Sequence, residues 1–167
     1  MHDVARSIFV IVAMLLVASC GADTEQLVST TPLDTNVSRS ADTANVEGVT
    51  VTGEDGSYTF SVTVQSPDSG CDEFADWWEV LSESGELIYR RVLLHSHVDE
   101  QPFTRTGGPV KVQLGEMVFV RAHMSTTGYG GATMLGSVTD GFRVAEIPSG
   151  FGNGVEVELP QPTGCAF

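Results

Sequence analysis

The sequence predicts an all-β protein, an antiparallel β-sandwich of the immunoglobulin or fibronectin type III kind. Three observations favour this fold. Short segments of alternating apolar and polar residues recur along the chain, about eight in all, which is a number typical of a sandwich. Turn-forming residues separate these segments. No stretch shows the 3.6-residue period of a helix. A jelly roll is the alternative architecture.

The first three expected strands lie in the first half of the predicted sandwich. Residues 49–52 and 58–64 both alternate, and the turn sequence Glu-Asp-Gly-Ser separates them, so we expect a hairpin. A third strand is expected at 76–81, where the neighbours Trp77 and Trp78 point to opposite faces.

The fourth expected strand covers 86–94 and carries apolar residues on both faces in its first half. Strands of this kind are typical of the middle of a sheet. We therefore expect this strand to be central and buried on both faces. Its end runs into a polar segment that reaches Arg105.

Four further strands are expected after this segment. The alternating or apolar stretches that predict them are 109–114, 117–125, 142–147 and 155–159. Residues 128–141 are rich in glycine and are expected to form a long loop. In the last strand, Glu156 and Glu158 are expected to face outward.

The composition and charge of the chain argue against one class of function. The chain has 167 residues, enough for one folded domain, and a formal net charge of −14 with a single lysine, Lys111. Nucleic-acid binding depends on clustered Lys and Arg side chains, so the sequence argues against a nucleic-acid partner.

The N-terminus resembles that of bacterial lipoprotein precursors. Residues 8–18 are apolar, but eleven residues are too few to span a bilayer and fit the core of a signal peptide. Val17-Ala18-Ser19-Cys20 is similar to a lipobox. The resemblance implies cleavage after residue 19 and acylation of Cys20, with palmitate or a similar chain anchoring the protein to the membrane. The expected location is the bacterial cell envelope, at the outer membrane in a Gram-negative cell.

The expected organisation therefore has three parts. Residues 1–19 are a signal peptide, residues 20–47 are the lipidated cysteine and a flexible polar tether, and residues 48–167 are the β-sandwich. Once Cys20 is acylated, Cys71 and Cys165 remain. A translocated protein folds in an oxidising compartment, so we expect these two to form a disulfide.

A histidine cluster is the strongest sign of a metal site. His95 and His97 share one strand face at the end of the fourth strand, and Asp99 and Glu100 follow at once. Either acid could be a ligand or could orient one. If the strand at 117–125 lies alongside, His123 completes a three-nitrogen site. Zn or Cu would suit these ligands.

Two family resemblances concern the same residues. His95-x-His97 with Glu100 and Gly107 is similar to the first metal motif of the cupin family, with two residues before the glutamate where that motif has three or four. No second cupin motif is present. His123-Met124 with Met134 resembles part of the His/Met pattern of periplasmic copper chaperones, without its closing His-x-Met.

Three classes of function remain open. The first, which we favour, is a non-enzymatic envelope binding module for a protein, peptide or glycan, with Trp77, Tyr129 and Arg105 as contact residues. The second is a periplasmic or surface metal-binding protein that uses the histidines. The third, which we favour least, is a metal-dependent enzyme. No catalytic residue is assigned, because no nucleophile–base pair is recognisable in the sequence.

Overall fold

The structure, a computed structural model, describes residues 41–166. The expected signal peptide, Cys20 and most of the expected tether lie outside the described residues. Within the described part of the chain, no helix has the length and apolar character needed to cross a membrane. The strands are β1 Asn45–Glu54, β2 Ser57–Gln65, β3 Ala75–Ser82, β4 Leu87–Val92, β5 Phe103–Val110, β6 Val118–Met124, β7 Thr133–Ser137 and β8 Gly141–Ala145.

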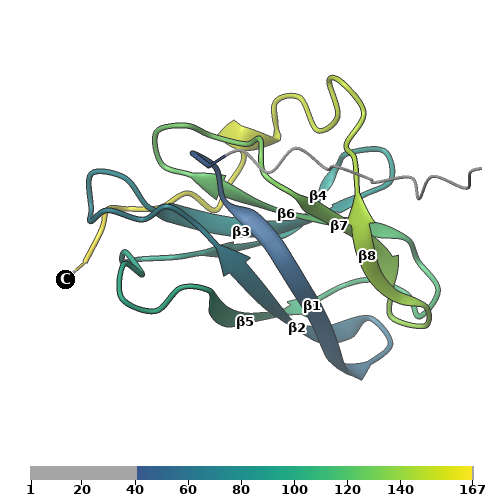
Figure 1. Cartoon of the computed structure of the whole chain (residues 1–167). Coiled ribbons are helices and arrows are strands. Elements are labelled where there is room, and N and C mark those ends of the chain that lie inside the picture. Colours follow the sequence, from purple (N-terminus) through teal and green to yellow (C-terminus); the bar gives the residue numbers. More distant parts are fainter. Residues whose placement is uncertain (1–40, 167) are drawn as a thin grey trace, which may run out of the picture. The chain divides into compact units, whose positions relative to one another are not determined.

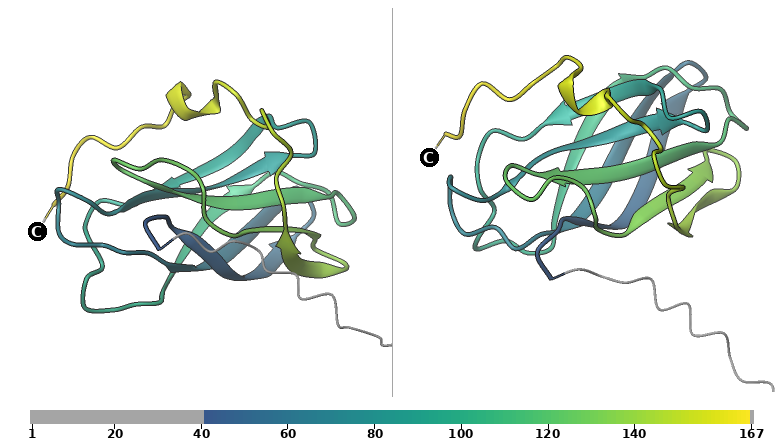
Figure 2. Two further views of the ribbon diagram at one scale, coloured as in Figure 1. Left: turned by 45° about the horizontal axis from the view of Figure 1, so that its top comes forward. Right: turned by 90° about the horizontal axis from the view of Figure 1, so that it is seen from above.

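The strands form two antiparallel sheets. The smaller sheet has the order β1-β2-β5, and the larger has the order β4-β3-β6-β7-β8. Figures 1 and 2 show the two sheets as stacked layers with most of the core between them. This arrangement confirms the predicted β-sandwich.

The first hairpin shows how the sequence pattern forms the core. β1 and β2 pair from Asn45↔Gln65 to Glu54↔Ser57, as expected. On β2 the alternate residues Tyr58, Phe60, Val62 and Val64 are buried between the sheets. Burying a large side chain of this type stabilises a fold by about 1.5–3 kcal/mol. The hairpin is therefore held by one apolar face.

The expectation that residues 86–94 form a central strand is wrong. β4 covers Leu87–Val92 and lies at the edge of the larger sheet, beside β3 alone. β3, β6 and β7 are the interior strands, and β3 and β6 are buried almost throughout. The apolar residues of β4 are covered without a further strand. Tyr89 packs on the main core, and Leu87 packs on the second core cluster that contains Val155.

Three other expectations change in detail. The strand expected at 109–114 is instead β5, which ends at Val110, although Val112 remains buried. The expected glycine-rich loop at 128–141 contains β7. Residues 155–157 form a short 3-10 helix where a strand was expected. The contacts of Arg90 with the backbone explain why this segment is not a strand.

The folded region begins before residue 48. β1 starts at Asn45, and its neighbours Ala44 and Val46 are 1% exposed. The backbone N–H of Val46 donates to the carbonyl of Ala132 over 2.9 Å, which ties this segment to the loop before β7. The end of the expected tether is therefore part of the sandwich.

Residues 150–166, here called the covering segment, cross the outer face of the larger sheet (Figure 2). The predicted Cys71–Cys165 disulfide is present, and the N–H of Ala166 donates to the carbonyl of Leu94. Both contacts fix the far end of the covering segment beside the loop that follows β4.

A buried charged row holds the rest of the covering segment. Glu79 on β3 lies between Arg90 on β4 and Arg121 on β6 in the sheet register. Arg90 donates to Glu79 Oε2 over 2.7 and 2.9 Å, and Arg121 Nε donates to Glu79 Oε1 over 2.7 Å. The exposed fractions of the three residues are 5% or less.

Arg90 also explains the local shape of the covering segment. Its terminal nitrogens donate to three backbone carbonyls, those of Val155, Glu158 and Pro160, over 2.7, 2.6 and 3.2 Å. Three carbonyls can converge on one guanidinium only if the chain turns back on itself, which an extended strand does not do. Residues 155–157 therefore form a helical turn.

We predict that replacing both cysteines, Cys71→Ser with Cys165→Ser, lowers the free energy of unfolding. The disulfide closes a loop of 94 residues, and chain entropy gives about 4–5 kcal/mol as an upper figure for such a loop. Urea denaturation followed by tryptophan fluorescence measures the change. Wild-type protein with added reductant should give the same lowered midpoint. An unchanged midpoint in both would contradict the prediction.

Glu79→Gln should be strongly destabilising, by about 3–5 kcal/mol, because it leaves two buried guanidinium groups without their shared carboxylate. The matched control is Glu83→Gln on the exposed turn after β3, where a change within about 0.5 kcal/mol is expected. Equilibrium denaturation of the two variants makes the comparison, and equal midpoints would show that the buried row contributes no net stability.

Candidate functional site

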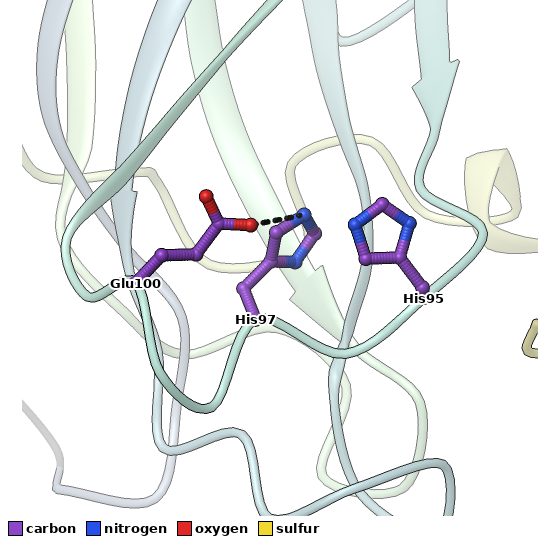
Figure 3. A group of neighbouring side chains, drawn as sticks. All are labelled: His95, His97 and Glu100. Carbon is purple, nitrogen blue, oxygen red and sulfur yellow. Dashed lines mark ion pairs between the residues drawn. The ribbon is translucent and has the colours of Figure 1, made fainter. Parts of the chain in front are cut away.

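The candidate metal centre lies in the loop between β4 and β5. His95, His97 and Glu100 each offer one ligand atom, and these atoms lie within 4.8 Å of one another. Figure 3 shows the three side chains turned toward a shared space, with the ring of His97 in the middle. The ring centroids of the two histidines are 4.5 Å apart.

The buried carboxylate of Asp68 shapes this loop. It accepts hydrogen bonds from the backbone N–H of His97 and of Ala75 over 2.7 and 2.8 Å, and from the hydroxyl of Ser66 over 2.7 Å. The side-chain amide of Gln101 donates to the carbonyl of His97 over 3.1 Å. The backbone on both sides of His97 is therefore fixed.

The ring of His97 is buried, with an exposed fraction of 1%, and stacks on Phe103 at a centroid distance of 3.7 Å. Nδ1 lies 3.6 Å from Asp68 Oδ2, and Nε2 lies 3.9 Å from Glu100 Oε1. These distances are too long for hydrogen bonds, and both ring nitrogens are unpartnered. A buried polar atom without a partner costs about 1–3 kcal/mol.

Burial lowers the pKa of His97, and the positive charges of Arg105 and His95 lower it further against the opposing effect of Asp68 and Glu100. The neutral imidazole is the form that binds metals. A proton on Nδ1, facing Asp68, leaves the lone pair of Nε2 for an ion beside Glu100. Such a carboxylate–histidine pair commonly orients a metal-binding ring.

The geometry therefore suits one ion with two nitrogen ligands and one oxygen ligand. Zn and Cu(II) accept such mixed sets, and three protein ligands leave a further position for water. Arg105 competes for this site, since its guanidinium pairs with Glu100 Oε1 over 2.5 Å. An ion at this place would have to take the carboxylate from Arg105.

Two residues expected at the metal site lie apart from this group. His123 is on β6, where its ring stacks on Trp77 at 3.7 Å. Its Nδ1 lies 2.7 Å from Asp76, and its Nε2 lies 3.4 Å from Glu156. Asp99 is exposed in the loop and is not among the three converging residues. Glu100 supplies the carboxylate instead.

The expected contact residues have varied surroundings. Trp77 is 3% exposed, and its ring lies between His123 and the guanidinium of Arg90, so it offers no open stacking surface. Arg105 pairs with Glu100 and lies 5.4 Å over the ring of Phe103. Tyr129 is half-buried and borders a cavity.

Tyr129 also belongs to the buried charged row. Its hydroxyl donates to Glu79 Oε1 over 2.8 Å and accepts from the indole N–H of Trp77 over 3.2 Å. Burial raises the pKa of this phenol, the nearby carboxylate of Glu79 raises it further, and Arg121 and Trp77 oppose the shift. The hydroxyl therefore stays protonated and remains a donor.

The cavity beside Tyr129 has a volume of about 640 Å³, within the range that holds small ligands. Its walls are the loop 128–133 and the segment 145–151, and Arg121 also lines it. Sequence reasoning missed this site. The available signal was a charged residue inside each of two largely apolar strands, Glu79 in β3 and Arg121 in β6.

The comparisons give one relative and no family. No family model matches the chain, and no solved structure matches it. The chain is 44% identical over 94 residues to a protein of Halomicrobium mukohataei named "Putative lipoprotein". The matched region covers 55% of this chain and 46% of that protein, so the chain spans about half the length of the relative it matches.

Proposed function

We propose that this chain is a lipid-anchored protein of the cell envelope whose β-sandwich binds a transition-metal ion, Zn or Cu(II), through His95, His97 and Glu100. The lipobox-like residues 17–20 and the name of the partial relative support the anchor. The Cys71–Cys165 disulfide supports a location outside the reducing cytoplasm.

One observation carries the metal proposal: both ring nitrogens of His97 are buried and have no hydrogen-bond partner. Buried polar atoms are nearly always paired in folded proteins. The lone pair of Nε2 would be satisfied by an ion held also by His95 and Glu100, while Nδ1–H would draw closer to Asp68. The proposal is one of binding and assigns no catalytic residue.

Zinc binding tests this proposal. We expect isothermal titration of the full-length protein to give one Zn²⁺ per chain, and His95→Ala and Glu100→Gln to weaken the affinity about 10–100-fold or more. His95 and Glu100 are exposed, so neither change should unfold the protein. The control is Asp99→Asn, an exposed acid in the same loop, which should keep the wild-type affinity.

The metal proposal fails if no zinc binds, or if the two ligand variants bind it as tightly as the wild type. Equal weakening by Asp99→Asn would also count against it, since that result indicates a general effect of negative charge.

The anchor has a separate test. In a host that processes lipoproteins, mass spectrometry of the mature protein should find an N-terminal peptide that begins at Cys20 and carries acyl chains. Cys20→Ser should abolish this peptide, whereas Ser19→Ala, which keeps a small residue before the cysteine, should retain it. An unmodified Cys20 in the wild-type protein would refute lipidation.

A further inference from the structure

The cavity lined by Arg121 and Tyr129 has a second set of unusual features, unconnected with the metal centre. Its floor comes from β6, one wall is the glycine-containing loop before β7, and the other wall follows β8. Gly131 is required there because a side-chain Cβ at this position would lie 1.9 Å from the carbonyl oxygen of Ala44. The loop is therefore packed closely on β1.

Arg121 has unused hydrogen-bonding capacity. Its Nε donates to Glu79, while Nη2 is buried and has no partner. The guanidinium also lies 3.6 Å from the ring centroid of Tyr129, which fixes its plane. A guanidinium has five N–H groups in a fork that matches a carboxylate. Nη2 at the end of this fork is buried beside Gly152 and lacks an acceptor, and Arg121 lines the cavity.

The charges of the buried row do not cancel. Glu79 is the one carboxylate shared by Arg90 and Arg121, and Tyr129 donates to it as a neutral phenol. One positive charge is therefore in excess. Arg90 spreads its charge over three backbone carbonyls, whereas among the described residues Nη2 of Arg121 has no acceptor. Arg121 lies at the floor of the cavity, and the exposed acid Glu146 is the other charged residue that lines it.

The wall opposite the loop is largely apolar. Ile147, Pro148 and Phe151 line it, and Phe151 is fixed against Phe119 at a centroid distance of 4.6 Å. Glu146 lines the cavity too and is exposed. A ligand that reached Arg121 would therefore pass its apolar body along this wall.

We propose that this cavity binds a small organic carboxylate, with the carboxylate group on the terminal nitrogens of Arg121 and the apolar body against Ile147, Pro148 and Phe151. This site is separate from the metal centre, and the proposal does not depend on metal binding. A carboxylate would supply both the missing acceptor for Nη2 and the missing negative charge. A neutral molecule of the same shape would supply only the first.

The test uses benzoate as the probe and benzamide as its neutral counterpart of the same shape. Full-length protein in EDTA is titrated with each compound, and ¹H–¹⁵N correlation spectra are recorded. We expect benzoate to shift the backbone signals of Gly130, Gly131 and Phe151 in a saturable way. Benzamide should bind about tenfold more weakly or not at all, because it lacks the charge.

Two variants locate the binding. Arg121→Lys keeps a positive charge near Glu79 but loses the forked donors, and it should weaken benzoate binding about tenfold. Ser149→Trp, at an exposed residue of the wall, should fill the cavity and abolish the shifts. Its control is Ser57→Trp, the same change at an exposed residue of β2, which should bind benzoate like the wild type.

Three results would each overturn the proposal. The first is the absence of benzoate-dependent shifts at the cavity signals. The second is equal affinity for benzoate and benzamide. The third is wild-type binding by Ser149→Trp. Loss of zinc binding in the His95→Ala and Glu100→Gln variants would leave these results unaffected, so the two proposals can fail separately.

Discussion

The carboxylate of Glu79 is the group on which the outer face of the larger sheet depends. It accepts hydrogen bonds from Arg90, Arg121 and Tyr129, and each donor fixes a different part of the chain. Arg90 binds the carbonyls of the covering segment, Arg121 forms the floor of the cavity, and Tyr129 holds the glycine-containing loop. A buried anion costs free energy to desolvate, and complete hydrogen bonding offsets that cost.

The fold class and the disulfide could be predicted because they depend on local pattern and on counting. Alternation along residues 58–64 predicts a strand with one buried face wherever the strand lies in the sheet. Strand order could not be predicted in this way. Residues 86–94 are apolar on both faces, but the second face is covered by distant residues such as Val155. The sequence pattern shows that a strand face is buried, but it does not show which residues cover that face.

The same distinction between local pattern and tertiary structure applies to the candidate site. His95, His97 and Glu100 are close in sequence, so the spacing of the histidines was informative and the cupin-like motif pointed to the glutamate. His123 could join them only through tertiary structure, and β3 lies between its strand and β4. The ring of His123 stacks instead on the ring of Trp77 on β3. The partners of Arg121 could not be singled out from the sequence, because they lie 42 and 8 residues away, on β3 and in the loop before β7.

The disulfide also has a consequence for the order of events during biosynthesis. Cys165 follows Cys71 by 94 residues, so the bond can form only after nearly all of the sandwich has been synthesised. Until then the covering segment is not tied down, and the backbone carbonyls that surround Arg90 are not yet in place. The three carbonyls and the half-cystine belong to one stretch of chain, so both attachments of this stretch need the C-terminal part of the chain. In the envelope location proposed above, the disulfide forms only after this last stretch reaches an oxidising compartment.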